Sequence, residues 1–391
     1  MAATRADVVV VGAGLFGTSV AFQLARRGAG EIVLVERDAP GAGDSGLSFS
    51  MVRRHYSNEV TARLAMRGVD VIRRWDEEVG TADSGYVRTG YLLIADAARV
   101  EAVRENVERL RAWGLDTTFV SPAEILALEP QLAPEGIAGG AYEPDGGFAD
   151  AQKMTLAWFA ACVRLGVRVE LGCRVRRLLV RDGRVTGVET DAGAIAASVV
   201  VNAAGAWGPE LARTVGVDVP VSLRRLQVAF VLQPADRAQA RFTFSSMVTN
   251  LVFRPDRAGL AGVVAYQPEE PLRSRDECRR ELDPGYEKAI RTALRERLPA
   301  YVDAEWAGGF AGAYDYTPDW NPLLGWAPGT EGLYLALGWS GHGFKLAPAV
   351  GEVVADEILG RPPAIDVRPL APGRFERGEE LRLAYGPGAR A

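Results

Sequence analysis

The sequence of 391 residues contains few of the side chains on which many catalytic centres depend. It has two His, three Cys and, among 45 Lys and Arg residues, only three Lys. Two His and three scattered Cys match neither a zinc site nor an iron–sulfur cluster, so the sequence predicts no metal centre. Three Cys in a chain of this size also argue against a fold that depends on disulfides.

Charge and hydropathy exclude further classes. A formal net charge of −5 argues against general electrostatic binding of nucleic acid. No uninterrupted apolar stretch reaches the ~20 residues that a membrane-spanning helix needs. Arg5 and Asp7 interrupt the short apolar run at the N-terminus, unlike a secretory signal. We therefore expect a cytoplasmic protein with no nucleic-acid partner and no membrane span, large enough for more than one domain.

A strand, a glycine motif and a helix follow one another near the N-terminus. The β-branched run Val8–Val11 predicts a strand buried on both faces of a parallel sheet. A helix is predicted over Thr18–Arg27 and a second strand over Ile32–Val35. The three elements form one complete βαβ unit.

The residues between the first strand and the helix read Gly12-Ala13-Gly14-Leu15-Phe16-Gly17. Gly12 permits the tight turn, Gly14 lets the backbone approach a diphosphate, and Gly17 lets the helix pack close to the strand. Glu36, at the end of the second strand, is placed to accept hydrogen bonds from a ribose. The motif predicts a bound dinucleotide but does not separate NAD from FAD.

The rest of the chain alternates between helical and strand patterns. Helices are predicted over residues 58–79, 97–113, 150–165, 284–297 and 344–359, and a capping box at Ser121 and Glu124 opens a short helix. Strands are predicted over residues 86–95, 167–171, 198–202, 221–233, 251–253, 260–266 and 332–337, with a hairpin about Asp182-Gly183.

This order predicts two domains that the chain crosses repeatedly. We place a nucleotide-binding domain at residues 1–85, 148–218 and 325–375, and a substrate domain at residues 86–147 and 219–324. Residues 376–391, rich in Gly, Glu and Arg, are expected to be a loosely held tail.

A second glycine motif, Gly338–Lys345, joins a buried strand to the start of a helix. Backbone N–H groups and a helix dipole at such a junction could stabilise negative charge that develops on a ring system. The same residues taken alone also fit a glycine turn with a hydrogen-bonded histidine.

Five motifs along the chain together resemble one family. They are the Gly12 fingerprint with Glu36, the Arg53 region, Asn202-Ala203-Ala204-Gly205-Ala206-Trp207, Tyr314–Asp319 and Ser340–Lys345. In this order they resemble the FAD-dependent amine oxidoreductases of the D-amino-acid oxidase, glycine oxidase and sarcosine oxidase type, with the sarcosine oxidase branch closest. The resemblance implies a Rossmann-like, glutathione-reductase-like FAD-binding domain (α/β), interleaved with an α+β substrate domain on a mainly antiparallel sheet.

The resemblance also implies which residues contact FAD. The ADP half would be held by Gly12, Ala13, Gly14, Phe16, Gly17, Glu36 and Arg37, with Val175 on the adenine side. Along the cofactor would lie Ala204, Gly205 and Trp207, and beside the edge of the flavin ring Ser45, Ser48 and Ser50. At the ring itself would lie Gly341, His342, Gly343, Phe344 and Lys345.

For the substrate, the sarcosine oxidase branch grips a carboxylate with one Arg and one Lys. Arg53 and Lys345 match these positions, and Arg54 is an alternative because one gap shifts the match. The planar fork of Arg suits bidentate binding, and Lys adds a second positive charge. Tyr314 matches an aromatic residue that closes over the substrate, or packs in the core, and Gln267 stands where the family has a pocket histidine.

Two departures from the branch are expected to matter. Gly312 stands where the sarcosine enzymes attach FAD through a Cys, so we predict non-covalent FAD. Val263 stands where they place an oxygen-activating Lys, which leaves dioxygen and another electron acceptor both open. No residue is identified as an obligatory base. His55 and His342 are either helpers in catalysis or hydrogen-bonded structural residues.

The resemblance implies oxidation of the C–N bond of a small carboxylate-bearing amine or amino acid, either secondary, N-methylated or of D configuration. A hydride would pass to flavin N5, and water would hydrolyse the resulting imine. A 2-hydroxy-acid oxidoreductase of the same fold and a flavoprotein subunit of a larger sarcosine-oxidase-like complex are the alternatives. Homo-oligomerisation is not encoded in any pattern that we recognise.

Overall fold

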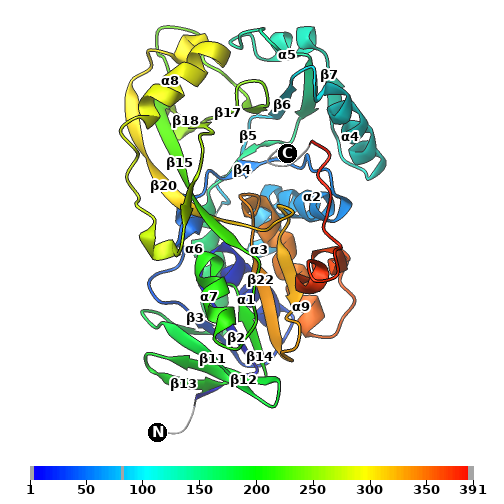
Figure 1. The fold of residues 1–391 in the computed structure, drawn as a ribbon, viewed down its shortest axis with the longest axis vertical. Helices are drawn as coiled ribbons and strands as arrows, with labels where there is room; N and C mark the ends of the chain where they lie inside the picture. Colours follow the sequence, from blue (N-terminus) through cyan, green and yellow to red (C-terminus); the bar gives the residue numbers. More distant parts are fainter. Residues whose placement is uncertain (1–3, 81–82, 386–391) are drawn as a thin grey trace.

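The computed structural model describes residues 4–80 and 83–385. Figure 1 shows two stacked halves, each built on a sheet, with the chain passing between them several times. Strands of the two large sheets alternate along the sequence. The predicted mixture of an α/β and an α+β part is thereby confirmed, and the domain limits stay a prediction.

The lower half is built on a six-stranded sheet that contains the predicted βαβ unit. Five of its strands are parallel, and the sixth, β21, pairs antiparallel at the edge. In spatial order they are β10 (Arg168–Glu170), β3 (Ile32–Val35), β2 (Val8–Val11), β14 (Val199–Asn202), β22 (Leu333–Leu337) and β21 (Leu323–Trp326).

Both faces of this sheet are covered, which explains its continuous apolar strands. Val8 and Val10 pack into one cluster with helices α1 (Leu15–Arg26), α2 (Glu59–Arg73), α6 (Ala151–Arg164) and α9 (Ala347–Ile358). Val9 and Val11 point the other way, toward α7 (Gly208–Arg213) and a small sheet. Alternate side chains of each strand therefore enter different cores.

A second, smaller sheet packs on the main sheet, and all of its strands lie within the residues that the sequence analysis places in the nucleotide-binding domain. It has four strands, β1 (Thr4–Arg5), β13 (Gly193–Ala196), β12 (Arg184–Thr190) and β11 (Val175–Arg181), and covers the main sheet without joining it. The predicted hairpin joins β11 to β12, and its residues Asp182 and Gly183 have φ of 52° and 75°. Two successive positive φ values are typical of a tight hairpin turn.

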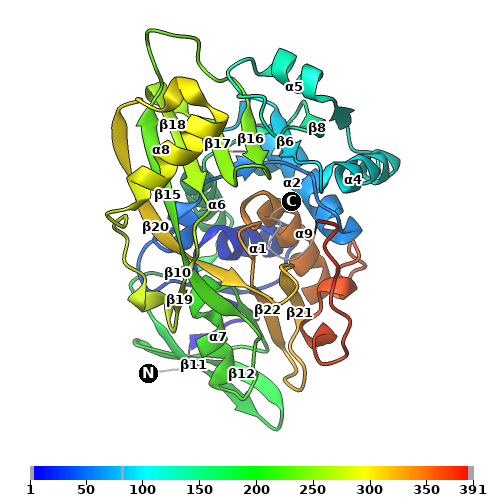
Figure 2. The same cartoon turned by 45° about the horizontal axis from the view of Figure 1, so that its top comes forward.

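The upper half is a mainly antiparallel sheet of nine strands, in which only the β6–β16 pair is parallel. Its main path is β19 (Glu270–Leu272), β15 (Ser222–Leu232), β18 (Leu260–Ala265), β17 (Leu251–Pro255), β16 (Thr243–Ser246), β6 (Tyr91–Ala95), β8 (Gly139–Glu143) and β7 (Thr118–Val120). The long strand β20 (Trp306–Tyr316) pairs with β15 and reaches down to the lower half (Figures 1 and 2).

Helices cover the upper sheet, and a separate three-stranded sheet lies between the halves. Helix α8 (Tyr286–Arg297) packs against the core of β16, β17 and β18, while α4 (Val100–Ala112) and α5 (Pro122–Leu128) pack near β7 and β8. The predicted capping box opens α5. The three-stranded sheet between the halves consists of β4 (Met51–Val52), β9 (Gly147–Phe148) and β5 (Val87–Arg88). Helix α3 (Trp75–Val79) follows α2.

The C-terminal residues correct one expectation. Instead of hanging loosely, residues 376–385 lie against the protein: Leu381 N donates to Asp319 Oδ2 at 3.1 Å, and Tyr385 is buried. Low hydropathy predicted a free tail because the polar partners that hold this segment lie far away in the sequence. Residues 386–391, also placed in that tail, lie outside the described residues.

Two features are absent from residues 4–80 and 83–385. Within these ranges we find no helix with the length and apolarity to cross a bilayer. The same residues contain no group of three or more His, Cys, Asp or Glu side chains that could hold a metal ion. The three Cys are buried and free.

Candidate functional site

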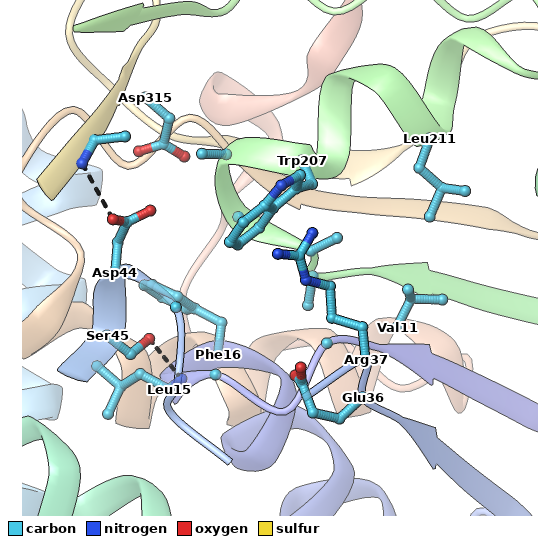
Figure 3. A pocket seen from close by; sticks show the side chains of 18 of the residues that line it. Val11, Leu15, Phe16, Glu36, Arg37, Asp44, Ser45, Trp207, Leu211 and Asp315 are labelled. Carbon is cyan, nitrogen blue, oxygen red and sulfur yellow. Dashed lines mark hydrogen bonds between the residues drawn. The ribbon is translucent and has the colours of Figure 1, made fainter. Parts of the chain in front are cut away.

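A cavity of about 400 Å³ extends from the carboxyl ends of β2 and β3 to the loop after β22 (Figure 3). It lies where ligands bind in open parallel sheets. Most of the residues that the sequence assigned to a cofactor line it: Gly12, Gly14, Phe16, Glu36, Arg37, Ser45, Ser48, Val175, Ala204, Gly205, Trp207, Gly341, Gly343 and Phe344. Tyr314 lines it as well.

The glycine turn at one end is fixed by close backbone contacts. Gly12 has a φ of +99°, and a Cβ there would lie 2.7 Å from the carbonyl oxygen of Ala203. A Cβ at Gly17 would lie 1.8 Å from the carbonyl oxygen of Gly12. Gly17 therefore shapes the turn from behind the cavity, and the N-terminus of α1 faces a ligand.

Polar side chains complete this end of the cavity. Glu36 accepts hydrogen bonds from Ala13 N at 2.7 Å and from Asp38 N at 2.9 Å, and it lines the cavity beside Val175. Ser45 Oγ accepts from Leu15 N at 3.0 Å, so the 44–47 turn sits against the start of α1. An acidic group at the strand end and open helix amides form the pattern that a nucleotide requires.

A bridge between the halves crosses the middle of the cavity. The guanidinium of Arg37 lies 4.0 Å from the centre of the Trp207 ring, as Figure 3 shows. Trp207 Nε1 donates to Asp276 at 2.9 Å, and Arg37 pairs with the same carboxylate at 3.5 Å. Asp276 belongs to the upper half of the chain, so this contact ties the two halves together over the cavity.

The other end of the cavity lies under the second glycine motif. A Cβ at Gly341 would lie 2.6 Å from the Tyr314 ring, and one at Gly343 would lie 2.9 Å from the Phe16 ring. These glycines keep two aromatic side chains against the cavity wall. Only residues without a Cβ allow this contact, which explains the Gly-x-Gly spacing of the motif.

Two carboxylates at this end were not identified from the sequence, Asp44 and Asp315. Figure 3 shows both directed into the same space. Asp44 pairs with Arg275 at 2.8 Å and accepts from Ala313 N at 3.1 Å. Asp315 accepts from Gly338 N at 2.9 Å, and burial raises its pKa to about 7. Asp315 thus links β20 to the second glycine motif.

Beyond this end lies a buried cluster of cations and aromatic rings, centred on Arg53. Arg53 Nη1 donates to the carbonyl of His55 at 2.6 Å, and Nη2 donates to His342 Nδ1 at 3.3 Å. The Arg53 guanidinium lies 4.6 Å from the centre of the Tyr56 ring. The side chain is 2% exposed, so its charge is held almost fully out of water.

Lys345 brings a second positive charge to the same cluster. Its ammonium lies 5.8 Å from the centre of the Tyr56 ring, and the residue is 3% exposed. Burial, and then the charge of Arg53, lower the pKa of Lys345 well below its usual value. The charge of the buried Glu143, which pairs with Arg54, acts in the opposite direction and raises the pKa of Lys345, but it does not outweigh these two effects. An anion that entered here would relieve both effects.

Both histidines belong to this cluster and stay neutral. Burial, followed by the charges of Arg53 and Lys345, lowers the pKa of His342 well below its usual value. Burial and Arg53 lower the pKa of His55 to about 3. Because Arg donates only, His342 Nδ1 must be unprotonated to accept from Arg53. The geometry gives the two histidines a role in holding Arg53.

Arg54, the alternative to Arg53, is engaged elsewhere. Its backbone N and its Nε donate to Glu143 Oε2 at 2.9 and 3.3 Å, and its Nη2 lies 3.7 Å from Asp145. Arg73 and Arg88 pair with the same Asp145. Arg54 is thus a member of a structural ion-pair network on the side of the cluster away from the cavity.

Other predicted positions lie outside the cavity. Gln267 is exposed, and its amide donates to the carbonyl of Tyr266 at 3.3 Å. Tyr266 is half-buried and interacts electrostatically with Arg53. Ser50 has a φ of 52°, accepts from Ala151 N at the start of α6 and lines a separate cavity of about 200 Å³. Ser48 lines both cavities.

On strand β18, Val263 stands at the position that the sequence comparison matches to the family's lysine, and the two faces of the strand lie in different surroundings. Val263 packs into the core under α8, whereas Val264 packs against Phe49 on the other face of the strand. Gly262 shares that second face, since a Cβ there would lie 2.7 Å from the Phe49 ring. The face toward the 44–50 loop therefore has Gly262, Val264 and Tyr266, and none of them is Lys.

A family comparison agrees with this geometry. The family model described as FAD dependent oxidoreductase (DAO) matches residues 7–357, which is most of the chain. The chain belongs to this family. Its cofactor is FAD, and the cavity fits it, because the N-terminus of α1, the carboxylate of Glu36 and a glycine-lined end border one continuous cavity.

The chain is similar to several enzymes of amines and amino acids. It is 25% identical to dimethylglycine dehydrogenase of Rattus norvegicus, with 95% of this chain and 45% of the relative covered. It is 26% identical to 4-methylaminobutanoate oxidase (formaldehyde-forming) of Paenarthrobacter nicotinovorans, with 97% and 47% covered. The chain thus spans a little less than half the length of these curated relatives.

One solved structure matches the chain almost from end to end. L-proline dehydrogenase from P. horikoshii superposes with a TM-score of 0.88 at 27% identity, covering 97% of this chain and 100% of that chain. Together with the family match, this similarity identifies the chain as an FAD-dependent oxidoreductase.

Proposed function

We propose that this protein oxidises the C–N bond of a small amine or amino acid that carries a carboxylate, in either a secondary, N-methylated or D form. The observation that carries the proposal is the pair of buried cations, Arg53 and Lys345, beyond the glycine-lined end of the cofactor cavity. The buried carboxylate of Glu143 acts on both cations but also pairs with Arg54, so positive charge is in excess here and a further anion would stabilise it. A substrate carboxylate is such an anion.

In this mechanism the protein holds and orients the substrate. Arg53 and Lys345 bind the carboxylate, His342 accepts from Arg53 and keeps its guanidinium in place, and Tyr314 closes over the substrate. FAD, when bound, would supply the acceptor for a hydride from the C–H next to the substrate nitrogen, and hydrolysis by water would convert the resulting imine into product. The buried cluster excludes water while the C–H is positioned.

No general base is needed if the amine binds in its neutral form. The low pKa values of His55 and His342 follow from burial and from the charge of Arg53 beside them. The same positive charges disfavour a substrate ammonium and favour the free amine.

We propose that FAD is bound without a covalent link. A Cβ at Gly312 would lie 3.4 Å from Asp44 Oδ1 and 3.5 Å from Leu47, two residues that line the cavity. This position therefore faces the cofactor, and glycine there offers no thiol. Acid precipitation of the holoprotein is expected to leave all of the flavin in the supernatant. Flavin in the pellet would contradict this.

Two alternatives use the same fold. A 2-hydroxy acid would satisfy the same pair of cations, and a flavoprotein subunit of a larger sarcosine-oxidase-like complex would pass electrons to a partner. Neither alternative specifies whether the electron acceptor is dioxygen or another molecule. Cytoplasmic location and homo-oligomerisation stay predictions; the rat relative is mitochondrial by its name.

Anaerobic reduction of the flavin tests the proposal. The holoprotein is mixed with N-methyl amino acids, D-amino acids, opines and 2-hydroxy acids, each paired with its carboxamide as a matched control. We expect bleaching of the flavin by an amine that carries a carboxylate and at least 100-fold slower bleaching by its carboxamide. Bleaching by hydroxy acids alone would overturn the amine assignment, and reoxidation in air would identify dioxygen as an acceptor.

A further inference from the structure

The last described residues form a strap across the junction between the halves. In Figures 1 and 2 the red segment rises from the lower half and ends between α2 and the upper sheet. Residues 376–385, which we call the strap, are attached at two points: Leu381 N donates to Asp319, and Ala384 N donates to Ser57 Oγ at 3.3 Å. Asp319 is itself buried in an ion pair with Arg374 at 2.8 Å.

Tyr385, at the end of the strap, meets His55 inside the protein. The Tyr385 hydroxyl lies 2.5 Å from His55 Nε2, and the two rings stack with centres 5.9 Å apart. Asn106 Nδ2 approaches the same nitrogen at 3.2 Å. An amide nitrogen only donates, which favours an unprotonated Nε2, and the single lone pair of this nitrogen then accepts from the nearer Tyr385 hydroxyl, while Asn106 Nδ2 also donates to the carbonyl of Tyr56 at 3.3 Å.

His55 in turn holds Arg53. Its carbonyl accepts the Arg53 Nη1 hydrogen bond, and its ring is fixed by Tyr385 and Asn106. Tyr91 adds a second link, because it packs in one cluster with Tyr385 and lies 6.0 Å from the Arg53 guanidinium. The position of the strap is therefore connected to the position of the guanidinium through two short paths.

We propose that Tyr385 is a positioning residue of the carboxylate site, acting on Arg53 through His55, and that the strap holds it there. This inference rests on the proposed function, in which Arg53 binds the substrate carboxylate. Tyr385 itself is not expected to touch the substrate. Its hydroxyl limits the tilt of His55, so that the carbonyl of His55 keeps the Arg53 fork directed at the carboxylate.

The test replaces the hydroxyl alone. Tyr385→Phe keeps the ring and its packing but removes the donor to His55. We expect KM for the carboxylate substrate to rise by about 3- to 10-fold, the range for loss of one buried hydrogen bond, with kcat changed less than about twofold. The Kd of propionate, measured on the holoprotein by the change in flavin absorbance, is expected to rise by the same factor.

Arg382→Ala is the matched control, because Arg382 is an exposed residue of the same strap. It should leave KM and the propionate Kd unchanged. In an Arg53→Ala background, Tyr385→Phe is expected to have no further effect on either quantity, because the group it positions is gone.

The outcomes separate the two proposals. If Arg53→Ala leaves KM unchanged, the carboxylate role of Arg53 fails, and the proposed function with it. If Arg53→Ala raises KM but Tyr385→Phe behaves like Arg382→Ala, the positioning role of Tyr385 is overturned. It is also overturned if Tyr385→Phe lowers only Tm, or raises KM equally in the Arg53→Ala background.

Discussion

The cofactor cavity and the Arg53 cluster are adjacent but are built in opposite ways. Glycine-containing strand-to-helix junctions, at residues 12–17 and 338–344, form the two ends of the cavity, and side chains of other segments, among them Arg37 and Trp207, line the space between them. The cluster is made of long side chains from five separate segments, among them β6, β8 and the strap. A local motif specifies the first, and only the folded chain assembles the second.

Because the two regions are built differently, we expect them to be sensitive to different kinds of substitution. The two ends of the cavity tolerate little added volume, because a Cβ at Gly12, Gly341 or Gly343 would meet backbone or an aromatic ring within 3 Å. The cluster depends on charge, since its cations are almost fully buried. Adding one methyl group should damage the first region, and removing one charge should damage the second.

The largest effect is expected from Gly12→Val. Its positive φ and the Ala203 carbonyl at 2.7 Å from a Cβ leave no place for a side chain. We expect complete loss of bound FAD, seen as the absence of visible flavin absorbance after purification. Gly285→Ala is the matched control, because nothing lies within 4 Å of its Cβ. If the Gly12→Val variant kept its flavin, the inference that this end of the cavity tolerates little added volume would be wrong.

A smaller but still large effect is expected from Arg53→Ala. Truncating one partner of a buried charge pair costs about 2–5 kcal/mol in binding, so KM for the carboxylate substrate should rise by roughly 30-fold or more. The carboxamide analogue should be affected far less. Steady-state kinetics with both substrates measure the ratio.

Arg54→Ala sharpens this prediction. Arg54 pairs with the buried Glu143, and loss of one partner of a buried pair typically costs about 3–5 kcal/mol in unfolding free energy. We expect a lower Tm with KM nearly unchanged, the opposite pattern to Arg53→Ala. If Arg54→Ala raised KM while Arg53→Ala did not, the two roles would be exchanged.

The smallest effect concerns pH and Lys345. Because burial and Arg53 lower its pKa, Lys345 loses its proton at a lower pH than an ordinary lysine. Carboxylate binding requires the charged form, so KM should rise as the pH rises through this lowered pKa, by about tenfold. Lys345→Met should show a higher KM that lacks this alkaline rise. An identical pH profile in both proteins would remove Lys345 from the carboxylate site.

The sequence predicted elements whose signal is local. The strands Val8–Val11 and Ile32–Val35 have the bounds expected, and the capping box at Ser121 opens α5. Strand β20 was not identified, because Gly308, Gly309 and Gly312 dilute its β-propensity and only its pairing with β15 stabilises it. The sequence also did not show that Val263 and Val264 of β18 enter different cores, since this alternation is set by what packs on each side of the strand.

The sequence by itself predicted the two glycine junctions and, through the resemblance of five motifs, the family and FAD, because each motif consists of residues that are neighbours in the chain. The tertiary structure decided which of two adjacent arginines faces Lys345, and it placed Asp44, Asp315 and Tyr385 beside the site. These contacts join residues separated by tens to hundreds of positions. No local pattern encodes such contacts, because they exist only when distant segments are packed against one another.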